Sequence, residues 1–241
     1  MTTRTALLLH GLGGAGGTWW RVAEALEAAG WTVSAPDLRG HGDGARGGSS
    51  RHDDFADDVL ALRPDGAGAW GLVVGHSLGG AVAVRAAARD PEWAARLALI
   101  DPVLRLPEER RAEVRADELD ALTATDEQLA AAVPGWDARD RAEKLRAAHA
   151  ADPSCVAAVL DDNDPWDLLA DVPALRSPVL VLAGDPQVFT FLGPRLAAEV
   201  LRANPRVRYA VVAGAGHSPH RDRPAETVAM LREWAESPAT A

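Results

Sequence analysis

The sequence has few of the residues that cross-link chains, span membranes or bind nucleic acids. Cys155 is the only cysteine among 241 residues, so an intrachain disulfide is excluded. No apolar run approaches the length of a membrane span, and the first residues lack the apolar core of a signal sequence. The 25 basic residues are outnumbered by 35 acidic ones, and no basic run offers a site for a phosphate backbone. We therefore expect a cytoplasmic protein without nucleic-acid or membrane partners.

Lysine is equally scarce, with a single residue in a chain rich in Ala, Arg, Gly and Asp. This composition fits a GC-rich coding bias and indicates nothing about function. Hydrophobic residues make up 47% of the chain, which is enough for a sizeable core at this length, so we expect one domain.

Short apolar runs alternate with segments of helical periodicity along most of the chain. The runs predict strands at 5–11, 31–35, 70–75, 96–101, 178–184 and 206–212. The periodic segments predict helices at 19–26, 53–62, 78–89, 194–203 and 225–234. Alternation of this kind is typical of the α/β class, with a mostly parallel sheet and helices on both faces.

The alternation stops between Pro102 and Ser177, where only helical patterns are found. Helix-start signals stand at Pro107, Asp126, Asp137 and Ser154. We predict a helical insertion at 102–177 that covers a core formed by 1–101 and 178–241.

The segment GHSLG at 75–79 directly follows an apolar strand and precedes a helix. A tight turn of this kind needs small residues on either side of Ser77, and it exposes the serine hydroxyl as a nucleophile. It also leaves the Leu78 N–H at a helix N-terminus, where it can stabilise an oxyanion. The alternative is a serine that only caps the helix.

A second glycine-rich loop, HGLGG at 10–14, follows the first predicted strand. Its Leu12 N–H is the candidate second oxyanion donor. A phosphate-binding loop is the alternative, but the glycines do not fit either common nucleotide pattern. We expect His10 to hold this loop in place and His76 to shape the turn around Ser77.

A histidine on a loop near the carboxyl end of the chain is the candidate general base. His217 follows the last predicted strand, and a loop histidine has a suitable pKa and enough freedom for two proton transfers. His220 is the alternative, and we expect it to be exposed.

These segments, in this order, resemble the α/β-hydrolase fold superfamily of serine esterases and lipases. The resemblance rests on HGLGG, DLRGHG, GHSLGG, LIDP and GAGHSPHRDRP and spans nearly the whole chain, from the family's third strand onward. It implies that Ser77 is the nucleophile, that His217 is the base and that Leu12 and Leu78 form the oxyanion hole. It also implies that 102–177 forms a cap over the pocket, and that the first two strands of the fold are absent.

The acid of the expected Ser-His-Asp triad has two candidates. The family usually places it after the glycine that ends a strand, with two residues in between, but that position here is Gln187. Asp185 directly follows Gly184 and is the favoured candidate. Asp101 ends an earlier strand from which some relatives supply their acid, and it is the alternative. Either carboxylate would orient the histidine and stabilise its charged form.

No metal or cofactor is expected, because the acidic segment 161–167 lacks the glycine and distal glutamate of a calcium loop. Candidate pocket residues are Trp136, His149, Trp166 and Phe189. The predicted function is hydrolysis of a small carboxylic ester or lactone through an acyl-enzyme. Alternatives are carbon–carbon bond hydrolysis or acyl transfer on the same triad, or a non-catalytic receptor for a small ligand. We expect a monomer or homodimer.

Overall fold

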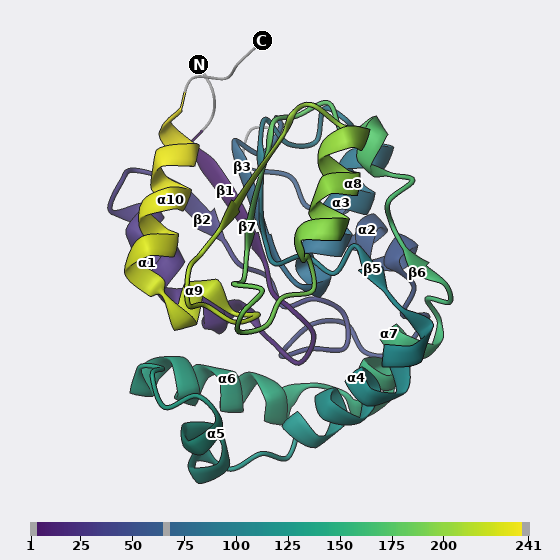
Figure 1. The fold of residues 1–241 in the computed structure, drawn as a ribbon, viewed down its shortest axis with the longest axis vertical. Coiled ribbons are helices and arrows are strands. Elements are labelled where there is room, and N and C mark those ends of the chain that lie inside the picture. Colours follow the sequence, from purple (N-terminus) through teal and green to yellow (C-terminus); the bar gives the residue numbers. More distant parts are fainter. Residues whose placement is uncertain (1–3, 65–67, 238–241) are drawn as a thin grey trace.

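The computed structural model describes residues 4–64 and 68–237 and contains a six-stranded parallel sheet (Figure 1). The strand order is β2-β1-β3-β4-β7-β8. The strands are β1 (Thr5–Leu9), β2 (Thr32–Ser34), β3 (Leu72–His76), β4 (Leu97–Ile100), β7 (Val179–Ala183) and β8 (Val207–Val211). This arrangement confirms the predicted α/β class and its mostly parallel sheet.

Both faces of the sheet are buried, which explains why its strands are continuous apolar runs. In β1, Leu7 and Leu9 belong to one hydrophobic core, whereas Ala6 and Leu8 belong to the other. Successive side chains of a strand point to opposite faces, so one short strand contributes to two cores.

Helices cover each face, as predicted (Figure 1). One core includes residues of α1 (Trp20–Glu27) and α10 (Pro224–Glu236). The other includes residues of α2 (His52–Ala61), α3 (Leu78–Arg89) and α8 (Pro194–Ala203). The short helices η1 (Gly16–Trp19) and α9 (Pro219–Asp222) were not expected, because they are too short to give a periodic signal.

Between β4 and β7 the chain forms four helices that lie mainly beyond one end of the sheet (Figure 1). They are α4 (Glu108–Ala121), α5 (Asp126–Ala132), α6 (Ala138–Ala150) and α7 (Pro153–Asp161). The same segment contains η2 (Val172–Ala174) and an antiparallel pair of short strands, β5 (Arg105–Leu106) and β6 (Trp166–Asp167). No strand was predicted here, and strands of two residues are too short to show alternation.

No helix within residues 4–64 and 68–237 is both long and apolar enough to cross a lipid bilayer.

Candidate active site

The turn between β3 and α3 places Ser77 at the carboxyl end of the sheet. Ser77 has a positive φ of 53°, a backbone conformation that costs energy in any residue but glycine. The glycines beside it are required sterically, because a Cβ on Gly79 would lie 2.2 Å from the carbonyl oxygen of Leu9. A Cβ on Gly75 would lie 2.5 Å from the carbonyl oxygen of Gly79. The sequence therefore permits the close approach of strand and helix that holds Ser77 in this turn.

The loop after β1 is held beside Ser77 by two buried histidines. His10 Nδ1–H donates to the Gly11 carbonyl (2.8 Å), and its Nε2 accepts from the Leu38 N–H (3.0 Å). His41 Nε2 accepts from the Gly13 N–H (3.1 Å). Burial lowers the pKa of His10 to about 3 and that of His41 to about 4, so both rings are neutral acceptors. His10 thus holds the loop, as expected from the sequence.

The two N–H groups predicted to bind an oxyanion are free to do so. Leu78 is the first residue of α3, and Leu12 lines the same cavity as Ser77. Within the described residues, neither N–H donates a hydrogen bond.

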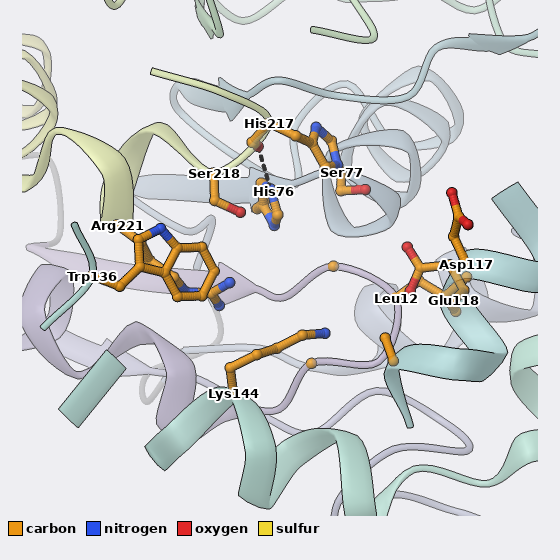
Figure 2. A pocket seen from close by; sticks show the side chains of 13 residues that line it. Leu12, His76, Ser77, Asp117, Glu118, Trp136, Lys144, His217, Ser218 and Arg221 are labelled. Carbon is orange, nitrogen blue, oxygen red and sulfur yellow. Dashed lines mark hydrogen bonds between the residues drawn. The ribbon is translucent and has the colours of Figure 1, made fainter. Parts of the chain in front are cut away.

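The carboxylate that contacts His217 is Asp101. The Nδ1–H of His217 donates to Asp101 Oδ2 over 2.6 Å, and Figure 2 shows the imidazole directly beside Ser77. Asp101 is fully buried at the end of β4 and has a positive φ of 37°. Its carboxylate also accepts hydrogen bonds from the Thr190 hydroxyl and, over 3.1 Å, from the Phe191 N–H. These contacts hold the carboxylate in position against the histidine.

The preference for Asp185 as the partner of His217 is therefore wrong as a matter of geometry. Asp185 is two residues beyond the end of β7, and its carboxylate accepts from the N–H groups of Gln187 (2.9 Å) and Gly214 (2.8 Å). These bonds lower the pKa of Asp185, a partly exposed turn residue, and each of its carboxylate oxygens accepts one of them. The alternative acid, Asp101, occupies the position instead.

Two further histidines lie next to His217. His76 Nε2–H donates to the His217 carbonyl over 2.8 Å, so it holds the histidine loop against the turn of Ser77 (Figure 2). The expected exposure of His220 is wrong: its ring is buried, stacked on Trp19 at 4.9 Å and in edge-to-face contact with His76 at 4.7 Å. Burial, with Arg221 close by, places the pKa of His220 well below 6.5, which makes it a poor general base.

Ser77 and His217 open into a cavity of about 210 Å³ between the sheet and helices α4 and α6 (Figure 2). The other side chains of its wall are largely polar: His76, Asp117, Glu118, Trp136, Lys144, Ser218 and Arg221, with Leu12 and Ala121. This cavity is smaller than a site for a drug-sized ligand.

Charges of both signs face this cavity. Burial lowers the pKa of Lys144 and raises that of Glu118, although each group partly offsets the other's shift. Burial lowers the pKa of Arg221 to about 10, so this guanidinium remains charged at neutral pH.

Of the four predicted pocket residues, only Trp136 lines the cavity. His149 is exposed and contacts the Ala124 carbonyl, because it lies five positions, or about 140° around the helix, from the inward-facing Lys144. Trp166 is buried in the core, where its N–H donates to the Val103 carbonyl. Phe189 packs 6.1 Å from the His217 ring, but it is partly exposed and outside the cavity.

Lys144, Arg221 and Glu118 were missed as cavity residues. The sequence did contain a signal for Lys144, because it is the only lysine of the chain. Its scarcity was interpreted as coding bias, so its position was not considered. Arg221 and Glu118 stand among many similar residues, and nothing local in the sequence distinguishes them. No group of three or more His, Cys, Asp or Glu side chains suited to a metal ion occurs in the described part of the chain.

Several known proteins with similar sequences or structures are named as a lipase, a deformylase or an esterase. The chain is 32% identical over 235 residues to N-formylmaleamate deformylase of Pseudomonas putida. The matched region covers 88% of this chain and 81% of the deformylase. It is 35% identical to the lipase LipV of Mycobacterium tuberculosis over 158 residues, but that match spans 56% of the lipase and 65% of this chain.

A solved structure of a thermophilic esterase from Thermogutta terrifontis, with malate bound, superposes with a TM-score of 0.75 at 26% identity, covering 98% of this chain and 90% of the esterase. The model of the alpha/beta hydrolase family matches residues 6–230. The parallel sheet, the strained serine turn at its carboxyl edge and these similarities lead to one conclusion: the chain belongs to the alpha/beta hydrolase family of enzymes.

Proposed function

We propose that this enzyme hydrolyses a small carboxylic ester or lactone through an acyl-enzyme formed on Ser77. His217 is the general base, Asp101 is the acid that orients it, and the N–H groups of Leu12 and Leu78 form the oxyanion hole. No residue in this mechanism requires a metal or cofactor.

The observation that carries this proposal is the hydrogen bond between His217 and buried Asp101, beside a serine held in a strained turn. The bond to Asp101 occupies Nδ1, so it leaves Nε2 of the neutral ring as the acceptor for the serine proton. The low dielectric around Asp101 strengthens its interaction with the imidazolium that forms when that proton arrives.

In the first half of the reaction, Ser77 Oγ attacks the carbonyl carbon while its proton passes to His217 Nε2. The carbonyl oxygen becomes an oxyanion that accepts from the N–H groups of Leu12 and Leu78. Removal of one such donor in other enzymes costs about 10²–10³ in rate, so the two free N–H groups are a substantial part of the catalysis. The proton on His217 then transfers to the departing alcohol oxygen.

In the second half, His217 Nε2 accepts a proton from water as the water oxygen attacks the acyl carbon. The same two N–H groups hold the second oxyanion. Collapse of this intermediate releases the carboxylic acid and returns the proton to Ser77. In a lactone the alcohol and acid belong to one molecule, and the same steps open its ring.

We also propose that α4 and α6 act as a lid that determines which substrates fit. They supply Glu118 and Lys144 to the wall of the cavity, whose 210 Å³ has room for roughly seven water molecules. The esterase and lipase names of relatives support ester chemistry, and the small cavity favours a compact substrate over a long acyl chain.

The alternatives are less well supported. A receptor would have no need for the buried acid that orients His217. The small, polar cavity gives no reason to prefer carbon–carbon bond cleavage or acyl transfer over hydrolysis. Enzymes of this fold that form an ester on a carboxylate nucleophile would need an acidic residue at position 77, where this chain has serine.

The direct test is covalent labelling with a fluorophosphonate probe, located by mass spectrometry of the digested protein. We expect one adduct, on Ser77, and loss of both labelling and hydrolysis of short esters in Ser77→Ala. Ser218→Ala is a matched control, because Ser218 lines the same cavity but has no assigned step. Ester hydrolysis that survives Ser77→Ala would overturn the proposal.

A further inference from the structure

Arg221 is a buried cation without an anionic partner. Its side chain is 6% exposed, lines the cavity from α9, and makes no hydrogen bond or ion pair with any described residue. Its buried Nε has no acceptor. Burial of an unpaired guanidinium is costly, and proteins rarely retain one without compensation.

The nearest attractive groups do not supply that compensation. The Arg221 guanidinium lies 5.0 Å from the centre of the Trp136 ring, a cation–π contact on one side only. Asp222 and Asp140 raise the pKa of Arg221 through space, but neither pairs with it. Asp222 instead accepts from the Trp136 Nε1–H (2.6 Å) and the Gly216 N–H (2.7 Å).

Asp140 is similarly occupied. It accepts from the Trp20 Nε1–H over 2.8 Å and from Arg21 over 2.9 Å. The donors of Arg221 that face the cavity therefore remain available to a ligand.

A second cation projects into the same cavity. Lys144 donates one of its N–H groups to the Gly13 carbonyl over 3.0 Å, which leaves two for other acceptors. Figure 2 shows Lys144 and Arg221 on one side of the cavity and the carboxylates of Asp117 and Glu118 on the other. The cavity therefore has a cationic side with unused donors and an acidic side opposite it.

We propose that Arg221, assisted by Lys144, binds a carboxylate of the substrate, so that the preferred substrates are small esters or lactones carrying a second, ionised carboxyl group. This inference rests on the proposed function, since it specifies the substrate class of the same site. A guanidinium fork matches a carboxylate by two parallel hydrogen bonds. The size of the cavity and its acidic side disfavour a doubly charged phosphate.

The decisive comparison uses two methyl esters with equal numbers of non-hydrogen atoms. Monomethyl succinate carries a terminal carboxylate, and methyl 4-methylpentanoate carries an isopropyl group of similar shape in its place. Hydrolysis of each is followed at pH 7.5 by titration of the acid released. We expect kcat/KM of the wild type to be about 10- to 100-fold higher for the succinate ester, the range expected for charge-assisted hydrogen bonds.

Variants then assign that preference to Arg221. Arg221→Met should remove most of the preference, and Arg221→Lys should retain part of it because it keeps the charge but not the fork. Arg195→Met is the matched control, since the Arg195 side chain is 98% exposed on α8 and outside the cavity. The ratio of kcat/KM for the two esters should be unchanged in this control, and thermal unfolding of each variant checks its fold.

The outcomes separate this inference from the proposed function. A wild type that is labelled at Ser77 but hydrolyses the isopropyl ester equally well or faster overturns the carboxylate site alone. A folded Arg221→Met that lowers kcat/KM for both esters by the same factor also overturns the carboxylate site alone. A wild type with neither labelling nor hydrolysis overturns the proposed function, and this inference with it.

Discussion

The replacement of Asp101 by Asn tests the central geometry of the proposed site, because it removes a charge without changing the shape of the side chain. Asp101 Oδ2 accepts from both His217 Nδ1–H and the Phe191 N–H, while Oδ1 accepts from the Thr190 hydroxyl. Asparagine has one acceptor oxygen, so it cannot serve both sides of this network. Either its NH₂ group faces His217 and forces the other tautomer, or its oxygen faces His217 without a charge.

Both arrangements give a large loss of activity. The wrong tautomer has a cost of about 10⁴ in kcat, as established for the triad of serine proteases. With the correct tautomer, the lost attraction between carboxylate and imidazolium is about 4 kcal/mol at roughly 4 Å and an effective dielectric constant near 20. Because each ~1.4 kcal/mol is tenfold in rate, this second arrangement costs about 10³. We therefore expect kcat of Asp101→Asn to fall by a factor of about 10³–10⁴.

The assay is hydrolysis of a short ester by purified wild type, Asp101→Asn and Asp185→Asn, with circular dichroism to check folding. Asp185→Asn is the matched control, since Asp185 only caps the N–H groups of Gln187 and Gly214. Its activity should stay close to that of the wild type. A folded Asp101→Asn with near-normal activity, or a crippled Asp185→Asn, would refute the assignment of the acid.

Three further predictions concern other parts of the molecule. Thr190→Val leaves buried Asp101 without one donor, which should lower kcat about tenfold with little change in KM, and Thr190→Ser should restore it. Burial lowers the pKa of His52 to about 3. The unfolded chain therefore binds more protons than the folded chain between pH 3 and 6.5, so stability decreases as the pH falls. At pH 5 this effect lowers the free energy of unfolding by about 2 kcal/mol relative to neutral pH. Urea titration should find this loss in the wild type but not in His52→Phe. Gly79→Ala drives a Cβ against the Leu9 carbonyl and should lower stability by about 1–3 kcal/mol or more in thermal unfolding, whereas Gly135→Ala, in open space, should not.

Much of the fold was predictable because its signals are local. The strands are buried on both faces and therefore read as apolar runs, and helices such as Leu78–Arg89 have the expected bounds. The elements that were missed have two to four residues, too few for a period to repeat. Their structure depends on contacts such as that between Trp166 and the Val103 carbonyl, far apart in sequence.

The residues around Ser77 were predictable to the extent that backbone geometry demands them. Glycines at 75 and 79 are required by the turn, and that requirement is visible in the sequence. The wall of the cavity is different, because Lys144 faces it and His149 does not for reasons of helix rotation. Helical periodicity identifies the faces of a helix, but it does not indicate which face lies over a cavity when most of its residues are polar.

The acid could not be assigned from sequence because β4 and β7 are neighbouring parallel strands that end at the same edge of the sheet. The structure nevertheless gives the turn after β7 a part in the site. Thr190 and Phe191 lie in this turn and hold the carboxylate of Asp101, and the Phe191 ring packs 4.7 Å from His217.

Arg110 of α4 lies over the rings of Phe189 and Phe191, which further covers the turn. Had the acid come from β7, this turn would need a polar residue directed at His217, and its aromatic rings would have no evident use. With the acid on β4, the same turn must instead supply donors to Asp101 and shield it from water. The composition of the turn after β7 therefore fits the proposed acid on β4, and we expect a sequence with an apolar turn at this point to have its acid on the earlier strand.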